Sequence, residues 1–270
     1  MDIELIDKKF EECKKLVTEE HYSKAIPLIR EVIDEVSSWY LAKEGKYLSF
    51  NHTLETYYYA YFCKDVSKLN YTEYNINAMY RLLGFALMKV GRNDEAIMAY
   101  NRGLDWNPVD LDTLLQLGEL YKATGNIKSL RKVSFEAYNF CCSRATMARF
   151  YRNLGYYYLE SLKPEIARAL YSYSNIYFET ENAHNELNFI KESLKDNTEY
   201  NLGQLQEIIK KEDIPLGPNS DTLGITFRVG QIEMDNGNYQ NAADCFAMVY
   251  DLSCDEEVKV LMEEAISKIN

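Results

Sequence analysis

The side chains that most often carry out catalysis or hold metal ions are few and scattered in this chain. The three histidines, His21, His52 and His184, lie far apart and outside any HExxH or Cys/His pattern, so a metal-assisted or triad mechanism has no support. Neither a CxxC pair nor a GxxxxGK[ST] or GxGxxG phosphate loop occurs. We interpret the six cysteines as reduced, mostly buried small hydrophobic residues: Cys13, Cys63, Cys141, Cys142, Cys245 and Cys254. We therefore expect no metal and no cofactor.

Carboxylate pairs, which acid–base catalysis would need, occur only in short runs such as Glu11-Glu12 and Glu263-Glu264. These runs lie on predicted solvent faces or at helix starts, where negative charge is simply solvated or favours the helix terminus. The chain is predicted not to be an enzyme.

The net charge excludes further classes of partner. The 30 basic and 42 acidic residues give a formal charge of -12, which repels nucleic-acid phosphates and anionic lipid. No window approaches the roughly 18 uninterrupted apolar residues of a membrane span, and the acidic, amphipathic amino-terminal stretch lacks the features of a secretory signal. We expect a cytoplasmic protein that binds neither nucleic acid nor membrane.

Glycine and proline are scarce, at 12 and 5 residues of 270, which favours long helices over turn-rich β folds. The clearest regularity is a repeat over residues 77–110. It places large, small and proline residues at the spacing of two packed helices: Tyr80, Leu83, Gly84, Leu87, Ala96, Tyr100, Gly103 and Pro108. Gly84 and Ala96 fall where the helices approach most closely. This pattern resembles the tetratricopeptide repeat family, whose unit of about 34 residues is a helix–turn–helix.

Further copies follow around Gly118, Gly155 and Gly230, and Cys13 takes the small position of an amino-terminal copy. The resemblance implies an all-α, right-handed superhelical solenoid with a carboxy-terminal capping helix, and we expect no strands. The predicted segments are a repeat-like unit (1–36), a degenerate helical pair (37–76), three repeats (77–110, 111–147, 148–181), a divergent pair (182–211), a linker (212–222), a repeat (223–254) and a cap (255–270).

Function in this family lies in the groove lined by the first helix of each repeat. Helical spacing next to the packing positions selects one stripe of each first helix. The residues predicted to line the groove are Arg81, Phe85, Met88, Glu119, Lys122, Arg149, Arg152 and Tyr156. Arginine together with aromatic rings is the composition of interface anchors. Alternatively, Arg81 and Arg152 pair with Glu119 or other acidic neighbours and hold adjacent repeats in register.

Some members of the family bind acidic carboxy-terminal tails of chaperones through a carboxylate clamp on three successive first helices. Arg81, Gln116 and Arg149 loosely match three of its five positions, whereas Phe85 and Asn153 depart from it.

These observations favour a non-enzymatic scaffold that binds a peptide, a disordered tail or a helix of another protein. An acidic or carboxylate-bearing segment would suit the arginine-rich stripe. One alternative is a sensor of a peptide or small metabolite, with 212–222 as the hinge of a curvature change. Another is an enzyme subunit, although the repeats consume almost every residue. The sequence identifies neither the partner nor the oligomeric state.

Overall fold

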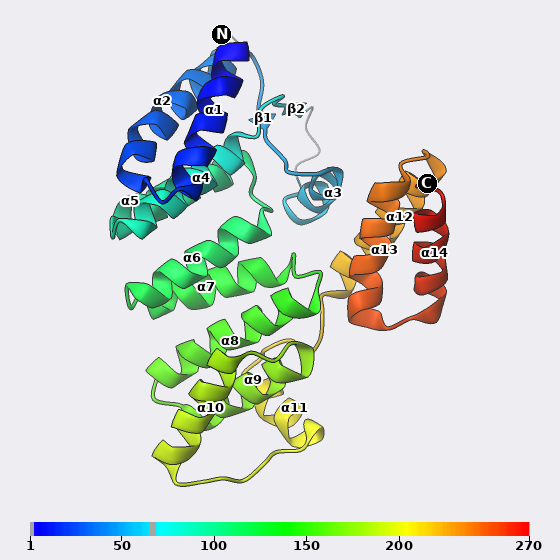
Figure 1. Cartoon of the computed structure of the whole chain (residues 1–270). Coiled ribbons are helices and arrows are strands. Elements are labelled where there is room, and N and C mark those ends of the chain that lie inside the picture. Colours follow the sequence, from blue (N-terminus) through cyan, green and yellow to red (C-terminus); the bar gives the residue numbers. More distant parts are fainter. Residues whose placement is uncertain (1–2, 65–68, 270) are drawn as a thin grey trace. The chain divides into compact units, whose positions relative to one another are not determined.

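Antiparallel helix pairs dominate the protein (Figure 1). The computed structural model describes residues 3–64 and 69–269, which form fourteen helices and two short strands. The chain divides into two units, residues 1–120 and 121–270, and each is described by itself.

The first unit is built mainly from helix pairs. Its elements are α1 (Ile3–Thr18), α2 (Tyr22–Leu41), β1 (Tyr47–Leu48), α3 (Thr53–Phe62), β2 (Asn70–Tyr71), α4 (Ile76–Lys89), α5 (Asn93–Trp106) and the start of α6 (Leu111–Ala123). α1 packs on α2, α2 packs on α4, and α4 packs on α5. The two strands and α3 lie between α2 and α4 in the sequence.

The pair α4/α5 shows how the sequence sets local structure. The Asn75 side chain caps α4 by accepting a hydrogen bond from the Ala78 amide. Gly91, with a φ of +74°, provides the left-handed residue that ends the first helix. On α4 the absent side chain of Gly84 makes room for Tyr100 of α5, because a Cβ there would lie 2.6 Å from the Tyr100 ring. The same pattern recurs where Gly155 meets Tyr171 and in the pair formed by Gly230 and Phe246.

The expectation that strands are absent is wrong. β1 pairs in parallel with β2, joining Tyr47 to Asn70 and Leu48 to Tyr71. Two-residue strands have no room for the alternating pattern that identifies strands in a sequence. Over 37–76, where the sequence predicts a degenerate helical pair, the described residues hold the end of α2, the strand pair and the single helix α3.

The second unit continues with helix pairs and ends in three packed helices. α8 packs on α7 and α9, and both α10 and α11 pack on α9. α13 packs on α12 and on α14, around a core that includes Phe246, Val249 and Val258. Its helices are α7 (Ile127–Tyr138), α8 (Arg144–Glu160), α9 (Pro164–Tyr177), α10 (Glu181–Leu194), α11 (Leu202–Lys210), α12 (Ser220–Asp235), α13 (Tyr239–Ser253) and α14 (Glu256–Ser267).

A buried arginine holds the loop between α10 and α11. Arg168, 1% exposed, forms an ion pair with Asp196 at 2.9 Å and donates to the Tyr200 hydroxyl. Hydrogen bonds from Thr198 first, and then from Arg168, lower the pKa of Asp196 to about 2. The loop is thus fixed by a charge that stays ionised far into acid.

The segment 212–222 is anchored to the helices of its own unit. The Tyr151 hydroxyl donates to the Pro215 carbonyl at 3.0 Å and accepts from the Gly217 amide at 3.0 Å. The Tyr138 hydroxyl donates to the Gly217 carbonyl at 3.2 Å, and Ile214 is buried. A pivot at this segment would have to break these contacts.

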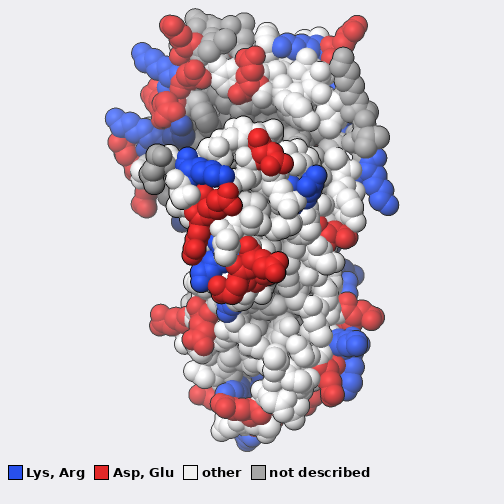
Figure 2. Space-filling model, turned by 90° about the vertical axis from the view of Figure 1, so that its right-hand side faces the viewer, with Lys and Arg blue, Asp and Glu red and all other residues white. Residues whose placement is uncertain are grey.

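Acidic and basic side chains are interspersed around uncharged areas on the face drawn in Figure 2. Within the described ranges, no helix is both long enough and apolar enough to cross a membrane.

Candidate functional site

A buried polar cluster lies at the start of α6, and it fixes one of the predicted groove residues. Asp110, 2% exposed, accepts hydrogen bonds from Asn77 at 2.9 Å and from Asn51 at 3.1 Å. It also accepts from the hydroxyl and the amide of Thr113. Arg81 Nη1 lies 2.9 and 2.8 Å from its two carboxylate oxygens. The Asp110 charge is therefore fully solvated by protein groups, with Arg81 as its counter-ion.

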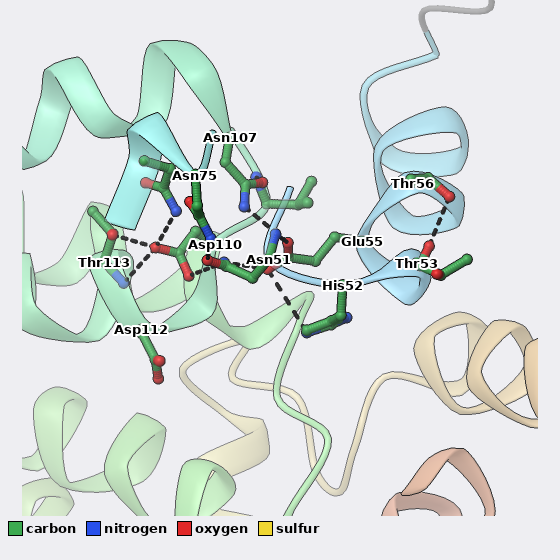
Figure 3. Close-up of polar contacts among 12 residues, drawn as sticks. Asn51, His52, Thr53, Glu55, Thr56, Asn75, Asn107, Asp110, Asp112 and Thr113 are labelled. Atoms are coloured by element: carbon green, nitrogen blue, oxygen red, sulfur yellow. Dashed lines mark hydrogen bonds and ion pairs between the residues drawn. The ribbon is translucent and has the colours of Figure 1, made fainter. Parts of the chain in front are cut away.

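The cluster extends to a second buried carboxylate (Figure 3). Glu55, 4% exposed, accepts from the Asn51 amide at 2.6 Å, from Asn51 Nδ2 at 2.9 Å and from Asn107 Nδ2 at 2.9 Å. Asn75 in turn donates to Asn51 Oδ1 at 2.9 Å. This network ties α3, α4 and the loop before α6 together, so the position of Arg81 is set by several elements at once.

A hollow of about 590 Å³ opens beside this cluster, between α1, α4, α5 and α6. That volume is within the range of about 300–1,000 Å³ found for ligand pockets. Its lining combines apolar surface with a few charged and amide groups: Phe10, Lys14, Ala78, Arg81, Leu82, Phe85, Tyr100, Asp112 and Gln116.

Aromatic rings and cations lie together in the walls of the hollow. The Phe85 ring meets Tyr22 edge-on at 6.1 Å between centroids, and Lys89 Nζ lies 5.2 Å from its centre. Across the hollow, Lys14 Nζ lies 5.1 Å from the centre of the Phe10 ring. Such cation–ring contacts help to orient both rings. Lys14 also forms an ion pair with Glu11 of the same helix, and Lys89 lies outside the lining of the hollow.

Two residues of the predicted stripe, Arg81 and Phe85, line this hollow, and so does Gln116 of the clamp comparison. The partner of Arg81 is Asp110, with Asp112 at 3.7 Å. Met88 and Glu119 are half-buried on the same helices and are not in its lining.

Sequence reasoning missed Phe10 and Lys14, although the signal was present. Arg81 and Phe85 lie three residues before and one residue after Gly84. The same offsets from Cys13, the small residue of α1, select Phe10 and Lys14. The spacing that selects the groove residues of α4 therefore also selects groove residues on α1.

The remaining stripe residues belong to the second unit. Arg152 donates from Nη2 to the Phe178 carbonyl, which follows the last turn of α9. Arg144, on the same helix, donates to the carbonyls of Ile176 at 2.7 Å and Tyr177 at 2.9 Å. These two arginines satisfy carbonyl groups at the end of α9 that the helix leaves open.

Burial shifts the pKa values of two side chains of this stripe. It lowers the pKa of Arg152 and raises the pKa of Tyr156. Tyr156, Arg149 and Lys122 are half-buried. The geometry thus gives Arg152 a contact that connects α8 to the end of α9, within one helix pair, and not an ion pair with an acidic residue of an adjacent repeat.

The thiols that are buried are shielded from reaction by a raised pKa. Burial raises the pKa of Cys13 to about 11 and that of Cys245 to about 12. Among the residues that the structure describes, no group of three or more His, Cys, Asp or Glu side chains is placed to hold a metal ion.

The tetratricopeptide repeat family model matches residues 78–110. No curated protein matches the chain. The solved structure of pilF from Pseudomonas aeruginosa is 13% identical and similar over 97% of this chain and 98% of that one, with a TM-score of 0.50. A tetratricopeptide repeat protein from Parabacteroides merdae is 10% identical over 97% of this chain and 98% of its own, with a TM-score of 0.40. The likeness to pilF is one of fold: successive packed helix pairs, as described above.

Proposed function

We propose that the chain, which matches the tetratricopeptide repeat model over 78–110 and is built from successive packed helix pairs, is a non-enzymatic scaffold that binds a segment of another protein. The observation that carries the proposal is the hollow between α1, α4 and α6. Apart from Tyr100 of α5, the lining comes from the three first helices α1, α4 and α6, and first helices are where a helical-repeat protein presents a binding surface.

The composition of the hollow favours a segment with both carboxylate and apolar side chains. Phe10, Leu82 and Phe85 offer apolar contact, and Lys14 and Arg81 offer cationic donors. Carboxylate recognition by such donors is strong and directional. The contacts of Arg81 to Asp110 and Asp112 all run through Nη1, so the other donors of the guanidinium lie outside these pairs.

The acidic character of the rest of the chain affects where an acidic segment can bind. With a formal charge of -12, most of the surface repels an acidic segment. In the hollow, Lys14 pairs with Glu11, and Arg81 pairs with Asp110, so attraction there depends on the donors that these two cations have left over. Association is therefore expected to weaken as salt increases. Asp112 at the rim restricts where a ligand carboxylate can lie, because two negative charges in direct contact repel each other.

A scaffold accounts for the structure better than a sensor that bends at 212–222. Bending there requires loss of the hydrogen bonds that Tyr151 and Tyr138 make with this segment. A scaffold requires no such rearrangement.

The test is a selection of random dodecapeptides on the purified protein, followed by measurement of Kd by fluorescence polarisation. Lys14→Glu reverses a charge in the hollow, and Lys15→Glu is the matched control, because both side chains are well exposed on α1 and only Lys14 lines the hollow. Ala78→Trp fills the hollow.

We expect selected peptides to be rich in Asp and Glu, and Lys14→Glu to raise their Kd about tenfold while Lys15→Glu leaves it unchanged. Ala78→Trp should abolish binding. Failure to select any peptide, or selected peptides that bind both the Lys14→Glu and the Ala78→Trp proteins as tightly as the parent, would contradict the proposal.

A further inference from the structure

A second pocket lies within the first unit, between α2, β1, α4 and α5. Its volume of about 550 Å³ is within the range of about 300–1,000 Å³ found for sites that bind small molecules. It shares no lining residue with the hollow described above. The pocket is therefore a separate candidate site, which a peptide bound in the hollow would leave open.

Aromatic side chains form much of the wall of this pocket. Tyr40 of α2, Tyr47 of β1, Tyr80 of α4 and Trp106 of α5 all line it. Tyr40 and Trp106 are 2% and 8% exposed, and the Tyr40 hydroxyl accepts a hydrogen bond from the Glu73 amide at 2.8 Å. The Tyr40 and Tyr47 ring centroids lie 5.3 Å apart. Rings held in this way favour a ligand ring that stacks on them or meets them edge-on.

The charges beside these rings disfavour a cationic ligand. The Lys43 ammonium already lies 4.9 Å from the centre of the Tyr40 ring and 5.7 Å from that of Tyr47. Lys46 lines the pocket as well and donates a hydrogen bond to the Tyr59 hydroxyl. Two ammonium groups beside the same rings repel a third cation, so a neutral or anionic ring compound fits better.

Arg102 supplies donors for an anionic group at the exposed edge of the pocket. Its side chain is 72% exposed, and the one hydrogen bond that it makes with the described residues runs from Nη1 to Asp105 at 3.4 Å. Tyr80 packs against the next residue of α5, because its Cβ lies 3.2 Å from the position of a Cβ on Gly103. Burial raises the pKa of Tyr80, and the Arg102 charge has the largest effect of any charge on it, in the opposite direction. The guanidinium thus acts on the pocket interior, and its Nε and Nη2 donors suit a carboxylate.

We propose that this pocket binds a small aromatic carboxylate, with the ring against Tyr47 and Trp106 and the carboxylate on Arg102. The proposal goes beyond the binding of a protein segment and does not depend on it, because the two sites have no residue in common. A one-ring or two-ring acid is short enough for both of its ends to be bound within one pocket of this size.

The test uses 3-(4-iodophenyl)propanoate, whose iodine quenches the fluorescence of an indole in contact with it. Trp39→Phe keeps a ring beneath the Lys43 ammonium and leaves Trp106 as the sole tryptophan, so all variants are made in this background. Arg102→Ala removes the proposed carboxylate contact. Arg92→Ala is the matched control, since it removes an arginine at the start of the same helix, outside the pocket. The amide of the probe tests the need for the negative charge.

We expect saturable quenching of Trp106 by the acid, with a Kd below about 1 mM. Arg102→Ala should raise this Kd about fivefold, as expected for the loss of one hydrogen-bonded contact, and Arg92→Ala should leave it unchanged. The amide should bind about fivefold more weakly than the acid in the Trp39→Phe background, and the two compounds should bind alike to the Arg102→Ala protein.

Three results would overturn the proposal. The first is quenching that shows no saturation up to about 10 mM of the acid, which indicates random collision rather than a site. The second is the same Kd for the acid in the Arg102→Ala and Arg92→Ala proteins. The third is an amide that binds as tightly as the acid in the Trp39→Phe background, a comparison that needs no change at Arg102.

Discussion

The contact between Gly84 and Tyr100 predicts a penalty for adding a single methyl group. A Cβ at position 84 would lie 2.6 Å from Cε1 and 2.8 Å from Cδ1 of the Tyr100 ring. An ordinary contact begins at 3.4 Å, so the ring must retreat by about 0.8 Å, the difference between 3.4 and 2.6. Tyr100 is wholly buried, so a retreat disturbs its neighbours.

The magnitude follows from two opposing effects of Gly84→Ala. Overpacking costs about 1–3 kcal/mol, while replacing a helical glycine by alanine gains about 1 kcal/mol. We expect a net loss of about 1 kcal/mol in the free energy of unfolding. In a Tyr100→Leu background the ring is absent, so the same change should gain about 1 kcal/mol. The coupling between the two positions is then about 2 kcal/mol.

Urea denaturation followed by tryptophan fluorescence measures this cycle. Both tryptophans, Trp39 and Trp106, belong to the first unit, so the signal reports the unit that contains the contact. If Gly84→Ala stabilises the protein equally in both backgrounds, the tight packing of Tyr100 against α4 is refuted.

Three further predictions concern polar contacts. Asp110→Ala leaves Arg81 without its buried counter-ion and should lower the free energy of unfolding by about 3 kcal/mol. Asp112→Ala, at an exposed site, should change the free energy of unfolding by less than about 0.5 kcal/mol. Urea denaturation of the two variant proteins measures both values. Because the pKa of Asp196 in the folded protein is about 2, below the usual value near 3.9, its stabilisation is complete above about pH 5 and is lost as the pH falls towards 2. Amide exchange in the loop between α10 and α11 should therefore accelerate over that interval, and an Asp196→Asn protein that shows the same acceleration would refute this. Tyr151→Phe removes two hydrogen bonds to 212–222 and should expose that segment to limited proteolysis; cleavage at the parental rate would count against the anchoring role.

The repeat could be predicted from the sequence because its determinants are local. Gly84 and Tyr100 are 16 residues apart on one helix pair, and their sizes complement each other wherever the pair is placed. The same holds for Gly155 and Tyr171. Residue types at fixed spacing therefore specify both the helices and their contact.

Features that depend on distant or irregular contacts could not be predicted. Arg81 lies on a predicted stripe, but its partner Asp110 comes from a loop whose position no periodic pattern specifies. The hydrogen bonds from Tyr151 to the 212–222 segment join residues more than 60 positions apart. Prolines and glycine indicate a loop there, and only the fold shows that tyrosines on α7 and α8 anchor it.

The central claim is that a protein segment binds in the hollow between α1, α4 and α6, and site-specific photocrosslinking tests it most directly. The photoreactive amino acid p-benzoylphenylalanine replaces Lys14 in one protein and its neighbour Lys15 in another, and each is irradiated with the selected acidic dodecapeptide. We predict a strong crosslink from position 14, which lines the hollow, and little from position 15. Equal crosslinking from both positions, or none from position 14 while the peptide remains bound, would contradict the claim.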